Sequence, residues 1–264
     1  NWLDEDLIIK MNQVTRHRGP DGTGFYLNYG ISLGHNRLSI LDLSDAGKQP
    51  MQSHDGRFVI TFNGEIYNFK ALRNELSEYP FKSESDTEVL LASYLKWGSD
   101  CVHKLNGIFA FAIWDTQKKE LFLARDPIGI KPLYYYFKDG KFIFASELKA
   151  ILEHPISRSL NPSAFNHYMR VRYAPAPETL IQGIEKLSPG HYLTLKDNSL
   201  EIIRYWSANI APNHERTKRE TVSQLRDITS RAVTRQLISD RPLGILLSGG
   251  YDSTTVLDNV SKIH

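Results

Sequence analysis

The chain has 264 residues, 41% of them hydrophobic and 11% aromatic, so it can bury a sizeable core as one large domain or two smaller ones. Lysine and arginine number 32 against 30 acidic residues, a balance that provides no basic field for nucleic acid or an anionic membrane. The single cysteine, Cys101, excludes an intrachain disulfide and favours a reducing, cytoplasmic location. The apolar runs are too short to span a bilayer, and the acidic N-terminus does not look like a signal peptide. We therefore expect neither a nucleic-acid nor a membrane partner.

The first part of the chain predicts many short strands after one helix. Apolar residues at helical spacing predict a helix over 3–14, and glycine and proline make 16–24 a loop. Runs rich in tyrosine, isoleucine, valine and phenylalanine then predict strands at 25–29, 31–41, 57–62, 109–114, 120–124, 133–137 and 141–145. Because the connections between these strands are short, the strands must be antiparallel.

Two helices interrupt the strands. One covers residues 68–76, and the other opens with a capping box at Ser85 and Glu88 and closes at Gly98. Strands with helices packed on them predict a layered α+β domain.

The composition of the sequence changes after the predicted strands. Irregular, proline-punctuated sequence precedes a last strand pair near Tyr192 and Glu201. The polar stretch 207–219 is poor in apolar residues and is typical of a linker. We therefore divide the chain into a first domain, 1–208, and the start of a second, 209–264.

The second part has the order helix, strand, glycine loop, helix, which is typical of a parallel α/β domain. Residues 220–240 have helical spacing, and the apolar run 243–247 predicts a buried strand. One strand cannot bury its helices, so we expect further sequence or a partner to follow. A Ser-Gly-Gly loop at a helix N-terminus binds anions, phosphate first, whereas the plainer alternative is that Ser248 or Asp252 only caps the helix.

The longer string "LLSGGYDS" resembles the pyrophosphate-binding signature of the ATP pyrophosphatase synthetases, in which ATP adenylylates a carboxylate. It fits neither the Walker pattern nor the dinucleotide fingerprint. The resemblance implies ATP with Mg²⁺, and an ATP-binding set made of Leu246, Leu247, Ser248, Gly249, Gly250, Asp252 and Ser253. No histidine spacing indicates a metal site, so we expect no metal ligands in the chain itself.

Upstream strings occur in the order found in class II, N-terminal-nucleophile glutamine amidotransferases, and resemble them: "RHRGPDGTG", "RLSILDLS", "FNGEIYNF", "SDTEV", "NGIFAFAIWD", "RDPIGIKPLYY" and "FASELKAIL". With the later strings "IEKLSPGHYL" and "LISDRPLGILLSGGYDS", the chain resembles the glutamine-hydrolysing asparagine synthetase family. The resemblance implies an αββα sandwich of antiparallel sheets followed by the beginning of a parallel α/β ATP pyrophosphatase domain. It also implies that glutamine hydrolysis supplies ammonia to an aspartate carboxylate activated by ATP as an acyl-adenylate.

Glutamine offers an α-carboxylate, an α-ammonium and a side-chain amide, so its site needs a guanidinium fork, an acidic acceptor and an oxyanion hole. By resemblance, Arg37 binds the carboxylate and Asp86 the ammonium. The Asn63 side chain and the Gly64 N–H are the catalytic oxyanion donors. The rest of the implied glutamine pocket consists of Leu38, Ser39, Ile40, Leu41 and Glu65.

Each of these residues also has a plainer interpretation. Asn63 and Gly64 are typical of a β-hairpin turn. Asp86 in the first turn of a helix suits the helix dipole without any ligand, and Arg37 on a strand suits an exposed ion pair. A structural salt-bridge cluster is the favoured interpretation for three charged residues, Arg125, Asp126 and Lys131.

The family nucleophile is a cysteine at the mature N-terminus, whose own α-amine acts as the base. This chain starts with Asn1, and Cys101 lies in mid-chain, where it is expected to pack as a small apolar group. We therefore expect an N-terminal strand carrying the nucleophile to be missing from the sequence given.

Several alternatives stay open at this point. β-Lactam-forming synthetases are similar in both domains but have lost glutamine hydrolysis, and the retained Arg37, Asn63, Gly64 and Asp86 argue against them. A related enzyme could amidate another carboxylate, such as a sugar acid, because the acceptor residues would lie beyond His264. A non-enzymatic remnant that binds glutamine or ATP is a further alternative. A simple glutaminase is disfavoured, because glutamine hydrolysis alone would give the string "SGGYDS" no role. The sequence does not decide the oligomeric state, and a homodimer is one of the states that it allows.

Overall fold

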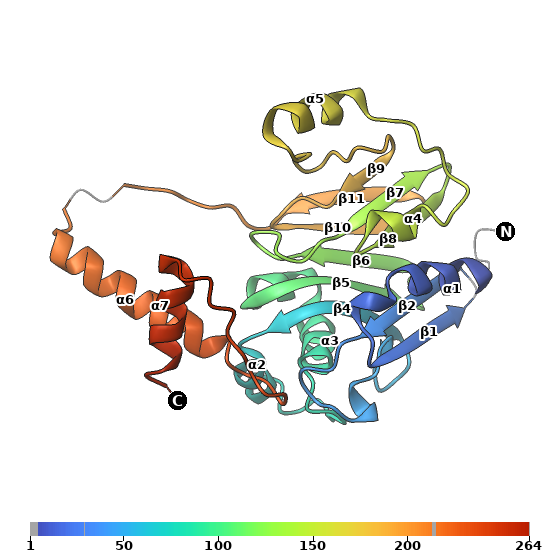
Figure 1. Ribbon diagram of the computed structural model, residues 1–264. Helices are drawn as coiled ribbons and strands as arrows, with labels where there is room; N and C mark the ends of the chain where they lie inside the picture. Colours follow the sequence, from blue (N-terminus) through green and yellow to red (C-terminus); the bar gives the residue numbers. More distant parts are fainter. Residues whose placement is uncertain (1–4, 29, 213–214, 264) are drawn as a thin grey trace. The chain divides into compact units, whose positions relative to one another are not determined.

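The computed structural model describes residues 5–28, 30–212 and 215–263, and it divides into two compact units, Asn1–Ser207 and Ala208–His264. Figure 1 gives the order of the elements along the chain. All the strands among the described residues belong to the first unit. The two units are described separately below.

Three antiparallel sheets form the first unit. The largest has six strands in the order β11-β10-β6-β5-β4-β3, with bounds β3 Met51–Gln52, β4 Phe58–Ile66, β5 Gly107–Asp115, β6 Glu120–Arg125, β10 His191–Lys196 and β11 Ser199–Arg204. A three-stranded sheet has the order β8-β7-β9, with bounds β7 Tyr134–Lys138, β8 Lys141–Ala145 and β9 Ile184–Lys186. The remaining sheet pairs β1 (Gly22–Asn28) with β2 (Ile31–Arg37). Every pairing between these strands is antiparallel, as the short connections predict.

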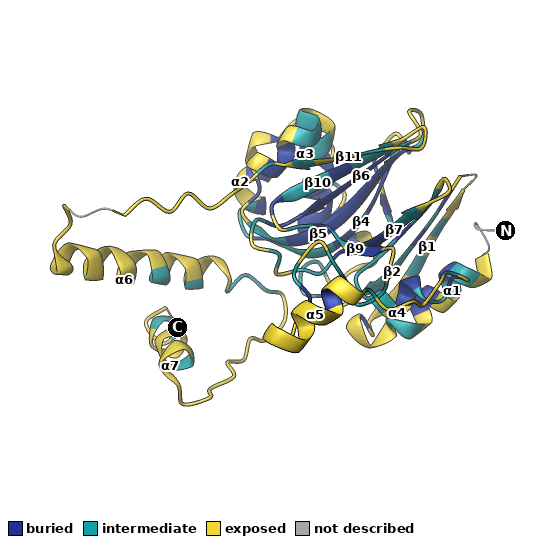
Figure 2. Cartoon of the chain, turned by 90° about the horizontal axis from the view of Figure 1, so that it is seen from above, coloured by how far each residue is buried: buried dark blue, intermediate teal, exposed yellow. Residues whose placement is uncertain are grey.

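The layers follow the order helix, sheet, sheet, helix, which is clearest in Figure 2. Helices α2 (Phe69–Glu75) and α3 (Asp86–Trp97) cover the outer face of the six-stranded sheet. Helices α1 (Glu5–Val14) and α4 (Leu148–Ile151) cover the outer face of the two smaller sheets. The predicted α+β, αββα arrangement is confirmed. Short 3₁₀ helices complete the unit at Arg16–Arg18, Asp45–Gly47 and Gly98–His103.

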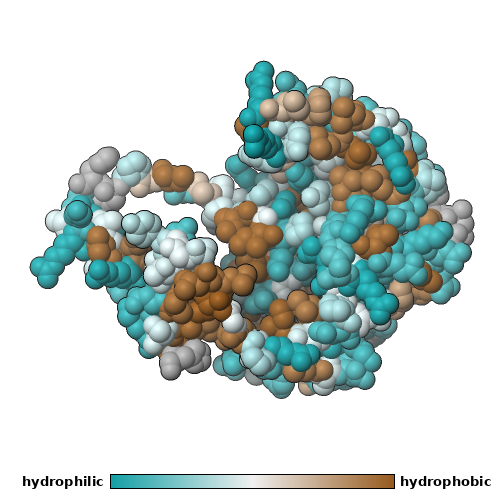
Figure 3. All heavy atoms as spheres, in the orientation of Figure 1, coloured by the Kyte–Doolittle hydropathy of each residue, from teal (hydrophilic) through white to brown (hydrophobic). Residues whose placement is uncertain are grey.

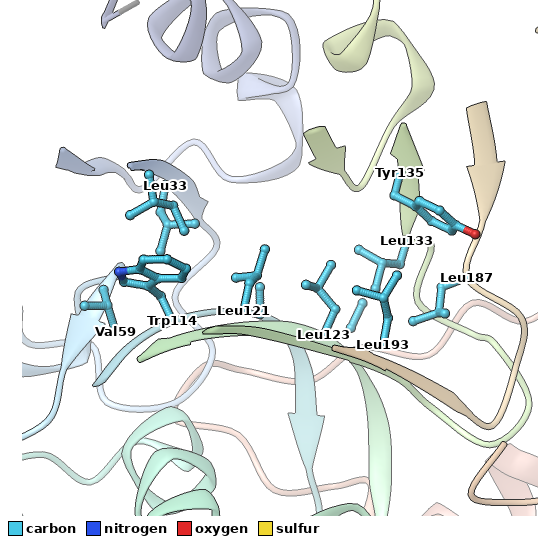
Figure 4. Close-up of a cluster of buried hydrophobic side chains, with 12 residues drawn as sticks. Leu33, Val59, Trp114, Leu121, Leu123, Leu133, Tyr135, Leu187 and Leu193 are labelled. Atoms are coloured by element: carbon cyan, nitrogen blue, oxygen red, sulfur yellow. The ribbon is translucent and has the colours of Figure 1, made fainter. Parts of the chain in front are cut away.

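Successive side chains of β5 point to opposite faces of the sheet, and both sets are buried in the core. Ala110, Ala112 and Trp114 face the smaller sheets and join a buried cluster with residues such as Leu33 and Leu193 (Figure 4). The alternate residues Phe109, Phe111 and Ile113 are buried on the other face. There the rings of Phe111 and Phe122 lie 5.9 Å apart, and the ring of Tyr94 of α3 lies 5.1 Å from that of Phe122 in a tilted arrangement. The sheet is therefore buried on both faces at β5.

Two helices of the first unit were not predicted, the short α4 and the longer α5. Residues Pro162–Val171 form α5, where the expected structure was irregular. The Asn161 side chain accepts the backbone N–H groups of Ser163 and Ala164, and Pro162 stands in the first turn. This asparagine–proline pair is a helix-start signal. The helix exposes apolar side chains, seen at the top of Figure 3.

The second unit is a pair of helices, α6 (Lys218–Arg235) and α7 (Tyr251–Val260), joined by extended chain. The strand predicted at 243–247 does not form, and its apolar side chains are exposed, Leu246 at 96%. A strand needs a neighbouring strand for its backbone hydrogen bonds, and the described part of this unit offers none. No described residue beyond 207 is buried, so the predicted parallel α/β layer is not seen.

No helix among the described residues is both long enough and apolar enough to cross a membrane.

Candidate functional site

A cavity of about 1080 Å³ lies between the sheets of the first unit. It runs beside β2 and β8, and both strands border it along their whole length. It gathers most of the predicted glutamine-site residues, which come from three separate segments of the chain: Arg37, Leu38, Ile40, Leu41, Asn63, Gly64, Glu65 and Asp86. Ser39 is the exception, since it is buried beside the cavity, where its N–H donates to the Asp21 carboxylate at 2.8 Å.

Arg37 ends β2, and backbone carbonyls fix its guanidinium. Its Nη1 donates to the Ser44 carbonyl at 2.8 Å, and its Nη2 donates to the Asp42 carbonyl. These bonds engage two of the five N–H donors of the side chain. A Cβ at Gly47 would lie 2.2 Å from Nη2, so a side chain there would displace the guanidinium from this position. The interpretation of Arg37 as an exposed ion-pair residue is therefore wrong.

Asp42 was not predicted as a site residue, although it lies in the "RLSILDLS" string. Its carboxylate accepts the backbone N–H of Glu84 at 2.8 Å and that of Ser44 at 3.1 Å. Burial alone would raise the pKa of Asp42, but these hydrogen bonds, with that from the Ser44 hydroxyl, hold it below its usual range. Asp42 thus ties the loop that holds Arg37 to the segment preceding α3.

Asn63 and Gly64 lie inside β4, opposite Ala110 and Phe109 of β5. The interpretation of this pair as a hairpin turn is therefore wrong, because the strand continues through it to Ile66. The Asn63 Nδ2 lies 3.5 Å from the Ser146 Oγ, which also borders the cavity.

Gly64 has no room for a side chain. A Cβ at this position would lie 2.2 Å from the Ile108 carbonyl oxygen and 2.8 Å from the Phe109 Cα. Both obstacles are backbone atoms of β5, which cannot move without disturbing the sheet. The close approach of two strands therefore demands glycine here.

Asp86 is the first residue of α3 and is 5% exposed. Ser85 is the N-cap, since its side chain accepts the Glu88 N–H, as predicted. The second half of the capping box is not made, because the Glu88 carboxylate accepts the N–H of Lys82 at 3.0 Å and that of Ser83 at 2.7 Å. The loop before α3 is thereby fixed by the helix itself.

The Asp86 carboxylate accepts the Ile66 N–H at 2.9 Å, which joins the start of α3 to the end of β4. Burial is the main reason that its pKa rises from 3.8 to about 7, and the charge of Glu65 adds to the rise. A carboxylate this deeply buried at the cavity is poorly explained by the helix dipole alone. Its environment suits a ligand cation.

Gln49 is a second residue that was not predicted. Its Oε1 accepts the Phe62 N–H at 2.6 Å, and its Nε2 donates to the Thr87 hydroxyl at 3.2 Å. Phe62 precedes Asn63, and Thr87 follows Asp86, so this buried amide holds the two halves of the site together. A lone glutamine before a proline carries no signal that could have identified it.

His35 is a neutral group on the cavity wall. Burial, then the nearby Arg37, lower its pKa from 6.5 to about 4. Its Nδ1 lies 3.3 Å from the Thr61 hydroxyl. It adds no positive charge to the cavity at neutral pH.

The predicted salt-bridge cluster of Arg125, Asp126 and Lys131 has a different form. The hydrogen bonds that the structure gives the Arg125 and Asp126 side chains go to backbone groups, and the Lys131 side chain borders the cavity. The expectation of a side-chain ion cluster is therefore wrong.

Cys101 lies in the 3₁₀ helix that follows α3 and is fully buried. Burial raises the pKa of its thiol to about 12, so it is not a nucleophile at neutral pH. It packs as the sequence predicts. The N-terminal nucleophile expected from the resemblance lies outside the described residues.

In the second unit, the Ser-Gly-Gly loop precedes α7. The Ser248 and Ser253 hydroxyls lie 3.0 Å apart, and the Ser248 N–H donates to the Ser253 Oγ at 3.3 Å. Gly249 has a φ of +78°, a conformation that favours glycine. Gly250 is the N-cap and α7 has no side-chain cap, so the alternative that Ser248 or Asp252 caps the helix is wrong.

Among the described residues, no three His, Cys, Asp or Glu side chains gather as metal ligands. Asp252, in the first turn of α7, is the carboxylate nearest in sequence to the Ser-Gly-Gly loop. Carboxylate and phosphate oxygens are the ligands that Mg²⁺ prefers, so this loop fits a magnesium ion delivered with a nucleotide.

A family model described as the glutamine amidotransferase domain matches residues 2–206. The chain belongs to the glutamine amidotransferase domain family. A second model, described as asparagine synthase, matches residues 224–263.

Named relatives agree with both models. An asparagine synthetase (glutamine-hydrolysing) 3 of Bacillus subtilis strain 168 is 40% identical over 259 residues, covering 96% of this chain and 42% of the relative. An asparagine synthetase 1 of the same organism is 38% identical, with 98% and 41% covered. An amidase chry2 of Gibberella zeae is 35% identical, with 98% and 39% covered. The chain thus spans about two fifths of the length of these relatives.

Among solved structures, a glutamine phosphoribosylpyrophosphate amidotransferase from B. subtilis matches this chain with a TM-score of 0.54 at 20% identity. The match covers 78% of this chain and 47% of that one. At this identity it supports the fold alone.

Proposed function

We propose that this chain belongs to a glutamine-dependent asparagine synthetase: its first domain, 1–208, binds and hydrolyses glutamine, and 209–264 begins the ATP-dependent synthetase domain. The observation that carries the proposal is the convergence of Arg37, Asp86 and the Asn63-Gly64 pair on one cavity. The 40% identity to a named asparagine synthetase supports the acceptor as aspartate.

In the proposed binding mode, the Arg37 guanidinium binds the α-carboxylate of glutamine. Its orientation is already fixed by the carbonyls of Asp42 and Ser44, so little side-chain entropy is lost on binding. The buried Asp86 carboxylate accepts the α-ammonium, which supplies the cation that its environment lacks. Glu65 and the backbone of 38–41 complete the pocket.

The remaining end of glutamine, its side-chain amide, would face Asn63 and Gly64. The Asn63 amide and the Gly64 N–H then stabilise the oxyanion that forms when a nucleophile attacks the amide carbon. In the family this nucleophile is an N-terminal cysteine. Removing one oxyanion donor typically raises the barrier by about 3 kcal/mol.

The second domain would use the ammonia. The loop at Ser248–Ser253, with Leu246 and Leu247 before it, is proposed to hold the phosphates of ATP at the N-terminus of α7. Asp252 would be the residue to hold the Mg²⁺ that accompanies ATP, and the ion would neutralise phosphate charge there. ATP supplies the adenylyl group that activates the acceptor carboxylate. We place this chemistry in the cytoplasm, where the single cysteine stays reduced.

Calorimetric titration of the 264-residue chain with free amino acids tests the proposal. We expect L-glutamine to bind and L-glutamate to bind at least about tenfold more weakly, because its side-chain carboxylate cannot donate N–H groups and brings a second negative charge into a cavity that already holds Asp86 and Glu65. D-Glutamine is the matched control, since it cannot present carboxylate, ammonium and amide to the same three groups. Equal affinity for L- and D-glutamine would contradict the proposal.

A second candidate keeps the amidotransferase chemistry and changes the acceptor, for example to a sugar acid. It is favoured by relatives named amidases that are 35% and 36% identical to this chain. AMP release from ATP, measured in the presence of ammonia with a protein that includes the whole synthetase domain, distinguishes the two. Release that depends on aspartate supports asparagine synthesis, whereas release that depends on another carboxylic acid supports the alternative.

A further inference from the structure

One buried amide side chain joins β4 to the first turn of α3. Gln49 lies just before β3, whose Met51 pairs with Ile60 of β4, so its backbone is anchored on the β4 side. Its Oε1 accepts the Phe62 N–H at 2.6 Å, and its Nε2 donates to the Thr87 hydroxyl at 3.2 Å. Gln49 is 9% exposed and Thr87 3%, so little water competes for these two bonds. The Gln49 bridge therefore fixes the separation between β4 and the start of α3.

A second hydrogen bond joins the same two elements further along β4. The Asp86 carboxylate accepts the Ile66 N–H at 2.9 Å. Phe62 and Ile66 lie on either side of the two proposed oxyanion donors, and each is linked to the first turn of α3. The part of β4 proposed to face the glutamine amide is thereby held to α3 at both of its ends.

The groups proposed to bind the amino-acid end of glutamine have a separate support. The Asp42 carboxylate accepts the Glu84 N–H at 2.8 Å, and the Arg37 Nη2 donates to the Asp42 carbonyl. Arg37 is thereby linked to the segment that leads into Asp86 at the start of α3. This support does not pass through Gln49, so a change in the Gln49 bridge leaves the amino-acid end in place.

A fixed separation between the two ends selects ligands by length. A free amino acid that engages both ends must place its ammonium on α3 and its side-chain amide on β4 at the same time. L-Asparagine carries the same groups as L-glutamine but is one methylene shorter, so it reaches both ends only if they can approach one another. One missing methylene is worth about tenfold or more in affinity when the site cannot adjust.

We propose that Gln49 is a positioning residue that sets the spacing between the oxyanion donors on β4 and Asp86 on α3, and thereby selects glutamine over the shorter asparagine. The inference rests on the proposed function for its ligand. The Gln49 bridge itself does not depend on that ligand.

Calorimetry of the 264-residue chain with L-glutamine and L-asparagine, in wild type and Gln49→Met, tests the inference. Methionine has a similar length and makes neither hydrogen bond of the bridge. We expect the glutamine affinity of Q49M to fall about tenfold, because the two ends are no longer held at the glutamine spacing. Asparagine, bound by its amino-acid end alone, should keep its affinity within about threefold. Equal losses for the two ligands would overturn the inference, because a general structural defect weakens both.

Thr87→Val removes the other half of the bridge and leaves the Gln49 bond to Phe62 in place, so it decides the matter if Q49M does not fold. Valine has the shape of threonine without the hydroxyl. We expect the ratio of glutamine affinity to asparagine affinity to fall by about threefold or more. Thr87→Ser is the matched control, because it keeps the hydroxyl and should keep the wild-type ratio. A ratio that falls as far in T87S as in T87V would contradict the role of the hydroxyl.

A further readout needs no ligand. By NMR, T87V should shift the amide resonance of Phe62, because the Gln49 amide transmits the loss of its contact with the Thr87 hydroxyl. In the Q49M background, the same substitution should leave the Phe62 resonance unchanged. If wild type fails to bind glutamine, the proposed function fails, and this comparison still decides whether the bridge couples β4 to α3. A Phe62 resonance that T87V affects equally in both backgrounds would overturn the bridge.

Discussion

At the residue scale, the site depends on one carboxylate that folding has made costly to ionise. Asp86 is buried at the start of α3, with a pKa raised to about 7 mainly by burial. If it binds the glutamine ammonium, Asp86→Asn should weaken glutamine binding by about 2 kcal/mol, since a hydrogen bond to a charged partner is lost. Calorimetry at about pH 8 measures the loss, with Asp100→Asn, outside the cavity, as the control. Unchanged affinity of D86N would contradict the assignment.

Gly64 should tolerate no side chain. In Gly64→Ala, the new Cβ would lie 2.2 Å from the Ile108 carbonyl oxygen, so β4 and β5 must separate. We expect the free energy of unfolding to fall by about 2 kcal/mol, and glutamine binding to weaken with it. The matched control is Gly22→Ala on β1, where a Cβ meets nothing closer than 4.0 Å. Urea unfolding measures both; equal stability of G64A and G22A would disprove the strand-packing explanation.

Sequence reasoning found the residues whose chemistry matches a free amino acid, and missed those that hold them. Arg37 and Asp86 carry charges that a zwitterion requires, so their types were informative. Asp42 and Gln49 act through backbone N–H groups and two hydroxyls, contacts that become visible only once the chain has folded. Arg125 and Asp126, whose side chains also bond to backbone groups, were predicted to form an ion cluster for the same reason.

At the element scale, the N-terminus of α3 positions Asp86, and Ser85 caps it with an acceptor for the Glu88 N–H. Ser85→Ala should reduce the free energy of unfolding by about 1 kcal/mol and also weaken glutamine binding, because the first turn of α3 frays. Thr217→Ala removes a comparable cap from α6 and is the control. We expect T217A to bind glutamine as wild type does. Equal effects of the two substitutions on affinity would contradict a role for the α3 cap in the site.

The elements predicted best from the sequence are those that depend on their own residues rather than on distant parts of the chain. The strand β5, the Ser85 N-cap of α3 and its end at Gly98 follow from local sequence, and all three were predicted, whereas the reciprocal Glu88 bond of the predicted capping box does not form. The run 243–247 satisfies the same apolar rule as a buried strand, yet it forms none, because a strand depends on neighbours that lie elsewhere in the chain. Helix α5 was missed although Asn161 and Pro162 are a helix-start signal. The prolines that follow the helix made the whole stretch look irregular.

At the scale of the whole molecule, Asp86 should make the stability of the first unit depend on pH. Its pKa is about 7 when folded and 3.8 at its ordinary value, so its contribution to stability is fully present below about pH 4 and is lost as the pH rises through about 7. Relative to Asp86→Asn, wild type should therefore lose about 4 kcal/mol between about pH 4 and pH 8.

Urea unfolding followed by tryptophan fluorescence measures this difference, because all four tryptophans lie within residues 1–207. Saturating glutamine should reverse the trend at about pH 8, since its ammonium stabilises the ionised carboxylate. Parallel pH profiles for wild type and D86N would show that Asp86 does not carry the buried charge.

The central claim is that Arg37, Asp86 and the Asn63-Gly64 pair bind one molecule of glutamine in the cavity between the sheets. A crystal structure of the chain grown with L-glutamine tests it most directly. We predict the α-carboxylate against the Arg37 guanidinium, the ammonium against Asp86 and the side-chain amide beside Asn63 and Gly64. Glutamine bound away from these groups, or in the cavity with its carboxylate turned from Arg37, would contradict the account.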